Sequence, residues 1–309
     1  MRRPDLPSRL VLRMLPPFAE ADSVDMAAAR AATDRAPLPL AWMRRGLRAV
    51  REGEVPGAEA ALRARLYVPR RARGLVLFLH GGGFALCGLD SHDGICAALA
   101  RRSGASVLSV GYRLAPDHPF PAAPEDAFAA YRWLRDQAGR LGGGTERIVV
   151  AGDSAGGNLA AVLCLMARDR GVEPPVLQVL FYPPTTGRED VPSRTLFADG
   201  YWLSTAMMEW FERLYLGGRV DEASPYYMPA RAADLSRLPP ALIVGAAFDP
   251  LRDEGRVYAA RLRAAGVAVR HREFPGTIHG FLNFHPFMPK AWLALREAGT
   301  AMRAALDGV

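Results

Sequence analysis

Apolar residues follow two patterns that alternate along most of the chain. Short apolar or alternating runs are typical of β-strands, and apolar residues that share one helical face are typical of α-helices. The predicted strands cover residues 62–68, 75–79, 107–110, 148–150, 176–181, 242–244 and 267–274. The predicted helices cover residues 123–138, 155–168 and 251–265. Alternation of this kind requires crossover connections, so it predicts an α/β protein with a mainly parallel sheet and helices on both faces.

Two segments depart from this alternation. Residues 1–45 are amphipathic and helical, with Asp22 or Ser23 as the N-cap of one helix. Residues 185–225 lose the strand pattern and carry a helix rich in aromatic residues and methionine, which we expect to form a separate covering element. The core is then expected in two parts, residues 46–184 and 226–309.

Composition sets the class of protein. Half of the 309 residues are apolar and 23% are charged, which is enough to bury a core and excludes disordered and collagen-like chains. The length fits either two domains or one α/β domain with insertions. The cysteines Cys87, Cys96 and Cys164 have no CxxC spacing, so we expect no disulfide framework and a reducing compartment.

The charge pattern excludes several partners. The net charge is +7, but the arginines are scattered beside acids, as in Arg168-Asp169-Arg170, so we expect no binding to nucleic acid. No run of eighteen apolar residues predicts a membrane span, and the apolar stretch at residues 10–15 is broken by Arg13 and lacks a cleavage site. We expect a soluble, cytoplasmic protein; a homodimer is one oligomeric state that the sequence allows.

The sharpest chemical signal is Gly152-Asp153-Ser154-Ala155-Gly156-Gly157, between a predicted strand and a predicted helix. GxSxG in that context is typical of a nucleophile elbow, a tight turn that exposes the serine hydroxyl. The N-terminus of the following helix favours negative charge at the same place. Ser154 is therefore the predicted nucleophile, in preference to an incidental serine in a glycine-rich loop.

A second glycine-rich loop, His80-Gly81-Gly82-Gly83-Phe84, follows the strand at residues 75–79. Such a loop can turn its amides toward a substrate carbonyl oxygen, as an oxyanion hole requires. We expect Gly82, Gly83 and Ala155 to supply the donors. No phosphate-binding GxxxxGK[ST] motif is present in the sequence, and His80 is expected to anchor the loop rather than act as a base.

A serine nucleophile needs a basic histidine. His279 follows the strand at residues 267–274 in a glycine-flanked loop, which places it at the carboxyl edge of the sheet. His271 is expected on a solvated face of that strand. The run Asp90-Ser91-His92-Asp93 could supply metal ligands, but without a second cluster we expect no metal site.

The base needs an orienting carboxylate. Asp249 also follows a predicted strand, whereas Asp253 and Glu254 are alternatives that fall in the next helix and are expected to form surface ion pairs. Asp153 is too close to Ser154 along the chain to hold the histidine from behind. The resulting order, Ser154, Asp249, His279, is that of α/β-hydrolases.

Together these motifs resemble the hormone-sensitive-lipase-like family of bacterial carboxylesterases. The resemblance extends from about residue 60 to the end and also includes Tyr112-Arg113-Leu114-Ala115-Pro116 and Pro119-Phe120-Pro121-Ala122-Ala123, with Asp117 where the family more often has glutamate. It implies the α/β-hydrolase fold, a Ser154–Asp249–His279 triad, and an oxyanion hole at Gly82, Gly83 and Ala155. It also implies a helical cap built from residues 1–45 and 185–225.

The same resemblance implies small-molecule esters with short to medium acyl chains, including aryl esters, as substrates. The candidate pocket walls are Phe84, Tyr201, Trp202, Leu203, Met207, Phe211 and Leu282, each of which could equally be cap core. Cys87 is expected to be a small buried residue near the oxyanion loop.

The expected reaction is a two-step acyl transfer through Ser154 that requires no metal or organic cofactor, and its rate should fall in acid as the base His279 is protonated.

Two alternatives remain open. The family is similar to plant gibberellin receptors, which suggests a binding protein, but those receptors lack the catalytic histidine that this sequence retains. The same triad could also cleave amides or peptides.

Overall fold

The computed structural model describes residues 3–15, 24–36, 38–141, 147–187, 191–218 and 224–308. One eight-stranded sheet has the order β1-β2-β4-β3-β5-β6-β7-β8. Its strands are β1 (Ala49–Pro56), β2 (Ala61–Val68), β3 (Leu75–Leu79), β4 (Ser106–Val110), β5 (Ile148–Asp153), β6 (Leu177–Phe181), β7 (Ala241–Phe248) and β8 (Val269–Ile278). Strand β2 is antiparallel to β1 and β4, and the other neighbours are parallel, which confirms the predicted mainly parallel sheet.

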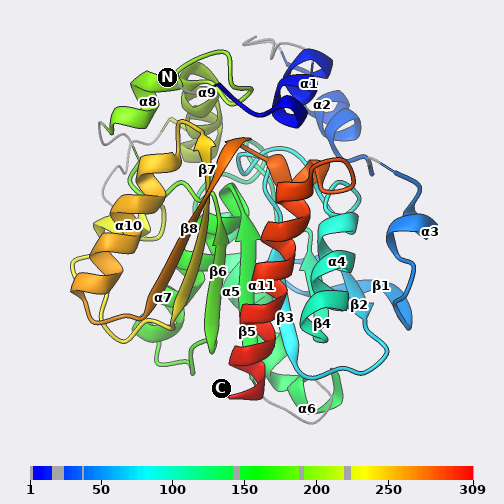
Figure 1. Cartoon of the computed structure of the whole chain (residues 1–309). Helices are drawn as coiled ribbons and strands as arrows, with labels where there is room; N and C mark the ends of the chain where they lie inside the picture. Colours follow the sequence, from blue (N-terminus) through cyan, green and yellow to red (C-terminus); the bar gives the residue numbers. More distant parts are fainter. Residues whose placement is uncertain are drawn as a thin grey trace.

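Helices cover both faces of the sheet. Successive side chains of each strand point to opposite faces, so each face carries apolar side chains that helices bury. In β3, Leu75, Leu77 and Leu79 belong to the core formed with α5, α7 and α10. Val76 and Phe78 of the same strand belong to the core formed with α4 and α11, the helices in front of the sheet in Figure 1. The bounds of these helices are α4 Asp93–Ser103, α5 Ala122–Asp136, α7 Ala155–Asp169, α10 Arg252–Ala264 and α11 Pro289–Asp307.

Further helices gather at one end of the molecule. Figure 1 shows α1 (Leu6–Met14), α2 (Met26–Thr33), α8 (Pro192–Leu196) and α9 (Thr205–Leu216) near the carboxyl ends of the parallel strands. The remaining helices are short: α3 Leu40–Met43, α6 Ala138–Leu141, and the 3₁₀ turns Pro229–Arg231 and Phe281–Phe284. No helix in the described ranges combines the length and apolar character needed to cross a bilayer.

The helix boundaries near the N-terminus differ from the prediction. Asp22 and Ser23 lie outside the described residues. The N-cap of α2 is Asp25, whose carboxylate accepts hydrogen bonds from the amides of Ala27 and Ala28 at 2.9 and 3.1 Å. Asp25 satisfies amides that the first turn of the helix leaves free, which is the role predicted for its neighbours.

Strand β1 was not predicted. It pairs with β2 at the edge of the sheet, and Val55 is its only buried residue. The exposed residues 51–54 are arginine, glutamate, glycine and glutamate rather than alternating apolar residues. The pairing with β2, rather than an apolar face, therefore makes this segment a strand.

A buried ion cluster ties the antiparallel strands to the start of α4. Arg65 of β2, which is 4% exposed, donates to Asp90, Asp93 and the Leu89 carbonyl at 2.7, 3.0 and 3.0 Å. Asp93 is fully buried and also accepts hydrogen bonds from Arg44 and Tyr67. Removing one partner from such a cluster leaves the other charges buried and uncompensated.

We therefore expect Asp93→Asn to lower the free energy of unfolding by about 3–5 kcal/mol. Urea unfolding followed by circular dichroism measures this change. The matched control is Glu54→Gln on the exposed part of β1, which should change stability by less than about 0.5 kcal/mol. A similarly small effect of Asp93→Asn would show that the cluster does not stabilise the fold.

Candidate active site

Ser154 lies at the turn between β5 and α7 in a conformation that non-glycine residues rarely adopt, with φ +51° and ψ −123°. Its amide donates to the Phe181 carbonyl at 2.9 Å. The flanking glycines allow close backbone approach: a Cβ at Gly152 would lie 2.2 Å from the Gly156 carbonyl oxygen, and one at Gly156 would lie 2.0 Å from that of Leu79. The turn that the GxSxG motif predicts therefore requires both glycines.

The three residues predicted as a triad form one hydrogen-bonded chain. His279 Nε2 lies 2.9 Å from Ser154 Oγ, and His279 Nδ1 lies 2.8 Å from Asp249 Oδ2. Asp249 is fully buried, and its other oxygen accepts from the Leu251 amide at 2.8 Å. A carboxylate only accepts, so Nδ1 carries the imidazole proton and Nε2 is free to accept from the serine hydroxyl.

The topology explains how residues so far apart in sequence meet. Ser154 follows β5, Asp249 follows β7, and His279 directly follows β8. These strands are parallel, so their carboxyl ends share one edge of the sheet, where open α/β sheets bind ligands. The ring of Tyr182 packs against that of His279 with centroids 4.8 Å apart and limits its movement.

Three consecutive residues of the loop after β3 have positive φ values. Gly82, Gly83 and Phe84 have φ values of +118°, +59° and +62°. No hydrogen bond between described residues uses the amide of Gly82, Gly83 or Ala155. All three residues line the same pocket as Ser154 and His279, so their amides remain able to bind a substrate oxygen.

His80, the first residue of this loop, is buried and is not among the residues that line the pocket at Ser154. Its ring stacks on Tyr112 with centroids 4.4 Å apart, and the Tyr112 hydroxyl donates to its carbonyl oxygen at 2.7 Å. Burial, aided by repulsion from His92, lowers the pKa of His80 to about 4, so the ring is neutral at physiological pH. These contacts agree with an anchoring role.

The alternative acids are not on the surface, which corrects that expectation. Glu254 is fully buried; it accepts from the amides of Thr185 and Thr186 at 2.7 and 2.9 Å and pairs with Arg194. Asp253 is also buried and accepts from the Ser193 amide at 2.9 Å. Glu254 therefore links Thr185, Thr186 and Arg194 to α10, and Asp253 links Ser193 to it, because a buried charge needs such partners.

Two histidines also differ from their expected environments. His271 is half-buried rather than solvated, and burial lowers the pKa of its ring. His92 is buried and pairs with Asp153 at 3.1 Å, a contact that the sequence analysis missed. Within the described ranges, no group of three His, Cys, Asp or Glu side chains is arranged to hold a metal ion.

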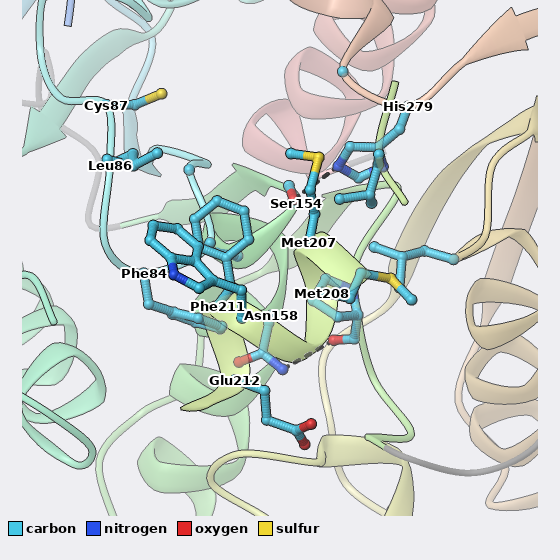
Figure 2. A pocket seen from close by; sticks show the side chains of 18 of the residues that line it. Phe84, Leu86, Cys87, Ser154, Asn158, Met207, Met208, Phe211, Glu212 and His279 are labelled. Atoms are coloured by element: carbon cyan, nitrogen blue, oxygen red, sulfur yellow. Dashed lines mark hydrogen bonds between the residues drawn. The ribbon is translucent and has the colours of Figure 1, made fainter. Parts of the chain in front are cut away.

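A pocket of about 720 Å³ opens at Ser154. Five of the seven predicted wall residues line it: Phe84, Trp202, Leu203, Met207 and Phe211. Figure 2 shows Phe84, Met207 and Phe211 gathered around Ser154. Cys87 also lines the pocket and is only partly buried, and burial raises the pKa of its thiol to about 12.

Tyr201 and Leu282 are not among the lining residues. The Tyr201 ring packs between Phe197 and Phe248, and Leu282 is fully buried in the core beneath α11. Strand and helix patterns do not reveal which side of a covering segment faces inward. The lining residues missed for the same reason include Leu15, Leu86, Asn158, Met208, Trp210 and Glu212.

Comparison with known proteins agrees with this architecture. A family model described as an alpha/beta hydrolase fold matches residues 76–283. The carboxylic ester hydrolase LipN of Mycobacterium tuberculosis is 45% identical over 263 residues, which cover 82% of this chain and 70% of LipN. An ethyl acetate hydrolase of Pseudomonas putida is 41% identical over 224 residues, which cover 72% of this chain and 70% of that enzyme.

Comparison with solved structures also agrees with this architecture. The structure of a hyperthermophilic esterase from Pyrobaculum calidifontis matches with a TM-score of 0.91 and 40% identity, over 98% of this chain and 99% of that one. The family match spans more than half of the sequence, and the structural match includes the sheet and the helices at its carboxyl edge. The chain belongs to the hormone-sensitive-lipase-like family of the α/β-hydrolases.

Proposed function

We propose that the protein is a serine esterase that cleaves short- to medium-chain acyl esters, including aryl esters, through an acyl-enzyme on Ser154. Its class is carboxylic ester hydrolase, as in its relatives. The observation that carries the mechanism is the Asp249–His279–Ser154 hydrogen-bonded chain, which ends in an open pocket. A nucleophile, a base in contact with it and a group that orients the base are the requirements for acyl transfer.

In the first step, His279 Nε2 takes the Ser154 proton while Oγ attacks the ester carbonyl carbon. The amides of Gly82, Gly83 and Ala155 bind the resulting oxyanion, and one such donor is worth about 2.7–4 kcal/mol. The tetrahedral intermediate collapses as His279 gives its proton to the leaving alcohol. Water then repeats the sequence on the acyl-enzyme and releases the carboxylic acid.

Asp249 fixes the ring of His279 and stabilises the imidazolium that forms during both steps. This carboxylate is fully buried and accepts hydrogen bonds from His279 and from the Leu251 amide, which hold it in place. The base must be neutral to accept the serine proton.

The pocket supports the proposed substrate class. Its walls near Ser154 are apolar and aromatic, with Leu203, Met207 and Phe211 on the covering segment and Phe84 on the oxyanion loop. Such walls suit alkyl and aryl groups, and methionine adapts its shape to either. The ethyl acetate hydrolase among the relatives is named for a small ester.

Ser154→Ala tests the nucleophile. Hydrolysis of p-nitrophenyl esters from acetate to palmitate should peak at short or medium chains in the wild type. It should fall by about 10⁴-fold or more in the variant, because no other group can carry the acyl chain. A long-chain optimum would contradict the substrate class. Retained activity in the variant, or no turnover by folded wild-type protein, would contradict the mechanism.

Asp249→Asn, compared with Asp253→Asn, tests which of the two carboxylates orients His279. We expect kcat to fall by about 10⁴-fold, since an amide at this position favours the wrong imidazole tautomer. The matched control is Asp253→Asn, which removes a buried carboxylate that instead accepts a hydrogen bond from the Ser193 amide. It should lower thermal stability but change kcat by less than about threefold. The opposite result would assign the orienting role to Asp253.

Paired ester and amide substrates with the same acyl group test the reaction class. With p-nitrophenyl butyrate and the matching p-nitroanilide, kcat/KM should be far higher for the ester, because an amine is a poorer leaving group. Comparable rates would identify an amide-cleaving enzyme.

A further inference from the structure

A second buried histidine–aspartate pair lies beside the proposed active site. His92 Nε2 is 3.1 Å from Asp153 Oδ1, and both side chains are almost completely buried. His92 precedes α4, whereas Asp153 is the last residue of β5 and the direct neighbour of Ser154. The proposed mechanism uses neither residue.

Hydrogen bonds on both ring nitrogens hold the His92 ring in place. The Ser91 hydroxyl, which donates to the Gly88 carbonyl at 3.0 Å, lies 2.9 Å from His92 Nδ1. Nε2 faces the Asp153 carboxylate, which only accepts. The Gly81 amide lies 3.3 Å from this nitrogen and 3.0 Å from Asp153 Oδ1, so it contacts both members of the pair.

The surrounding charges favour this ion pair. Burial alone would lower the pKa of His92, but attraction to Asp153, with a contribution from Asp34, outweighs it and raises the pKa. Burial likewise opposes ionisation of Asp153, and His92 outweighs that effect and lowers the pKa of the carboxyl. The nearest other ring, His80, has its centroid 5.6 Å away and is neutral.

The pair is attached to the loop that precedes the proposed oxyanion donors. The Gly81 amide donates to Asp153 Oδ1 at 3.0 Å. A Cβ at Gly81 would lie 2.7 Å from the other oxygen of the same carboxylate, so the backbone is pressed against it. Gly82 and Gly83 follow directly, and one carboxylate therefore fixes the start of the loop relative to the nucleophile.

A contact from the N-terminal helices supports His92 from the other side. Asp34, which ends α2, accepts from the amides of Asp90 and Ser91 at 3.0 and 2.8 Å. Ser91 in turn holds the His92 ring. Hydrogen bonds thus run from α2 through Ser91, His92 and Asp153 to Gly81.

We propose that His92 and Asp153 are positioning residues, which hold Gly81 so that the amides of Gly82 and Gly83 point to the place where the oxyanion forms. This inference rests on the proposed function, because it concerns the geometry of the same reaction. It assigns no proton transfer to the pair. Its consequence is that loss of the pair weakens transition-state binding and leaves ester binding nearly unchanged.

His92→Ala tests the proposal in the full chain with p-nitrophenyl butyrate. We expect kcat to fall about 10²–10³-fold, the effect of losing one oxyanion donor, with KM within about threefold of wild type. The affinity for an alkyl trifluoromethyl ketone, which forms a tetrahedral oxyanion on the serine, should fall in parallel with kcat/KM. His92→Gln, which keeps a donor toward Asp153, should recover part of both losses.

His285→Ala is the control, since it removes a different histidine, which is partly buried and lies after the 3₁₀ turn Phe281–Phe284. It should leave kcat and ketone affinity unchanged. If His92→Ala does not fold, the near-isosteric Asp153→Asn replaces it and should give the same kcat loss. A folded His92 or Asp153 variant with kcat within threefold of wild type would overturn the positioning role, while Ser154→Ala still decides the proposed function separately.

Discussion

The close passage of backbone at the turn between β5 and α7 is the constraint on which the rest of the site depends. Gly152 and Gly156 let α7 begin directly against the end of β3, where any side chain would collide with a carbonyl oxygen. That contact forces Ser154 into a positive φ and lifts its hydroxyl to the carboxyl edge of the sheet. It also brings the first amide of α7 beside the loop that follows β3.

Parallel strands then supply the partners. Because β5, β7 and β8 all end at this edge, Asp249 and His279 reach Ser154 without any long loop. Buried carboxylates hold the surrounding segments in place: Glu254 binds Thr185, Asp253 binds Ser193 and Asp153 binds Gly81. The site is thus a rigid polar framework beneath an apolar pocket, an arrangement that suits acyl transfer because the donors are oriented before the substrate binds.

The parts of the fold and of the site that could be predicted from sequence are those set by residues close together along the chain. The elbow, the glycine-rich loop and most strands follow from short-range steric and apolar patterns, and these predictions gave the fold class and the residues that meet at Ser154. Strand β1 was not predicted, because its position at the edge of the sheet leaves most of its side chains exposed and so without an apolar pattern. The pairing of Asp153 with His92 was not predicted. Successive side chains of a strand point to opposite sides, so the position of Asp153 next to Ser154 in sequence does not show where its side chain points. The pocket walls depend on how the covering segments fold back, which no local pattern encodes.

The most direct test of the central claim is to trap the covalent intermediate. The folded protein is incubated with an alkyl p-nitrophenyl phosphonate, which reacts with an activated serine, and the modified peptide is identified by mass spectrometry. We expect a single phosphonyl group on Ser154, formed at least about 10³-fold more slowly in Asp249→Asn. Modification of a different residue, or no modification of a protein that hydrolyses esters, would contradict it.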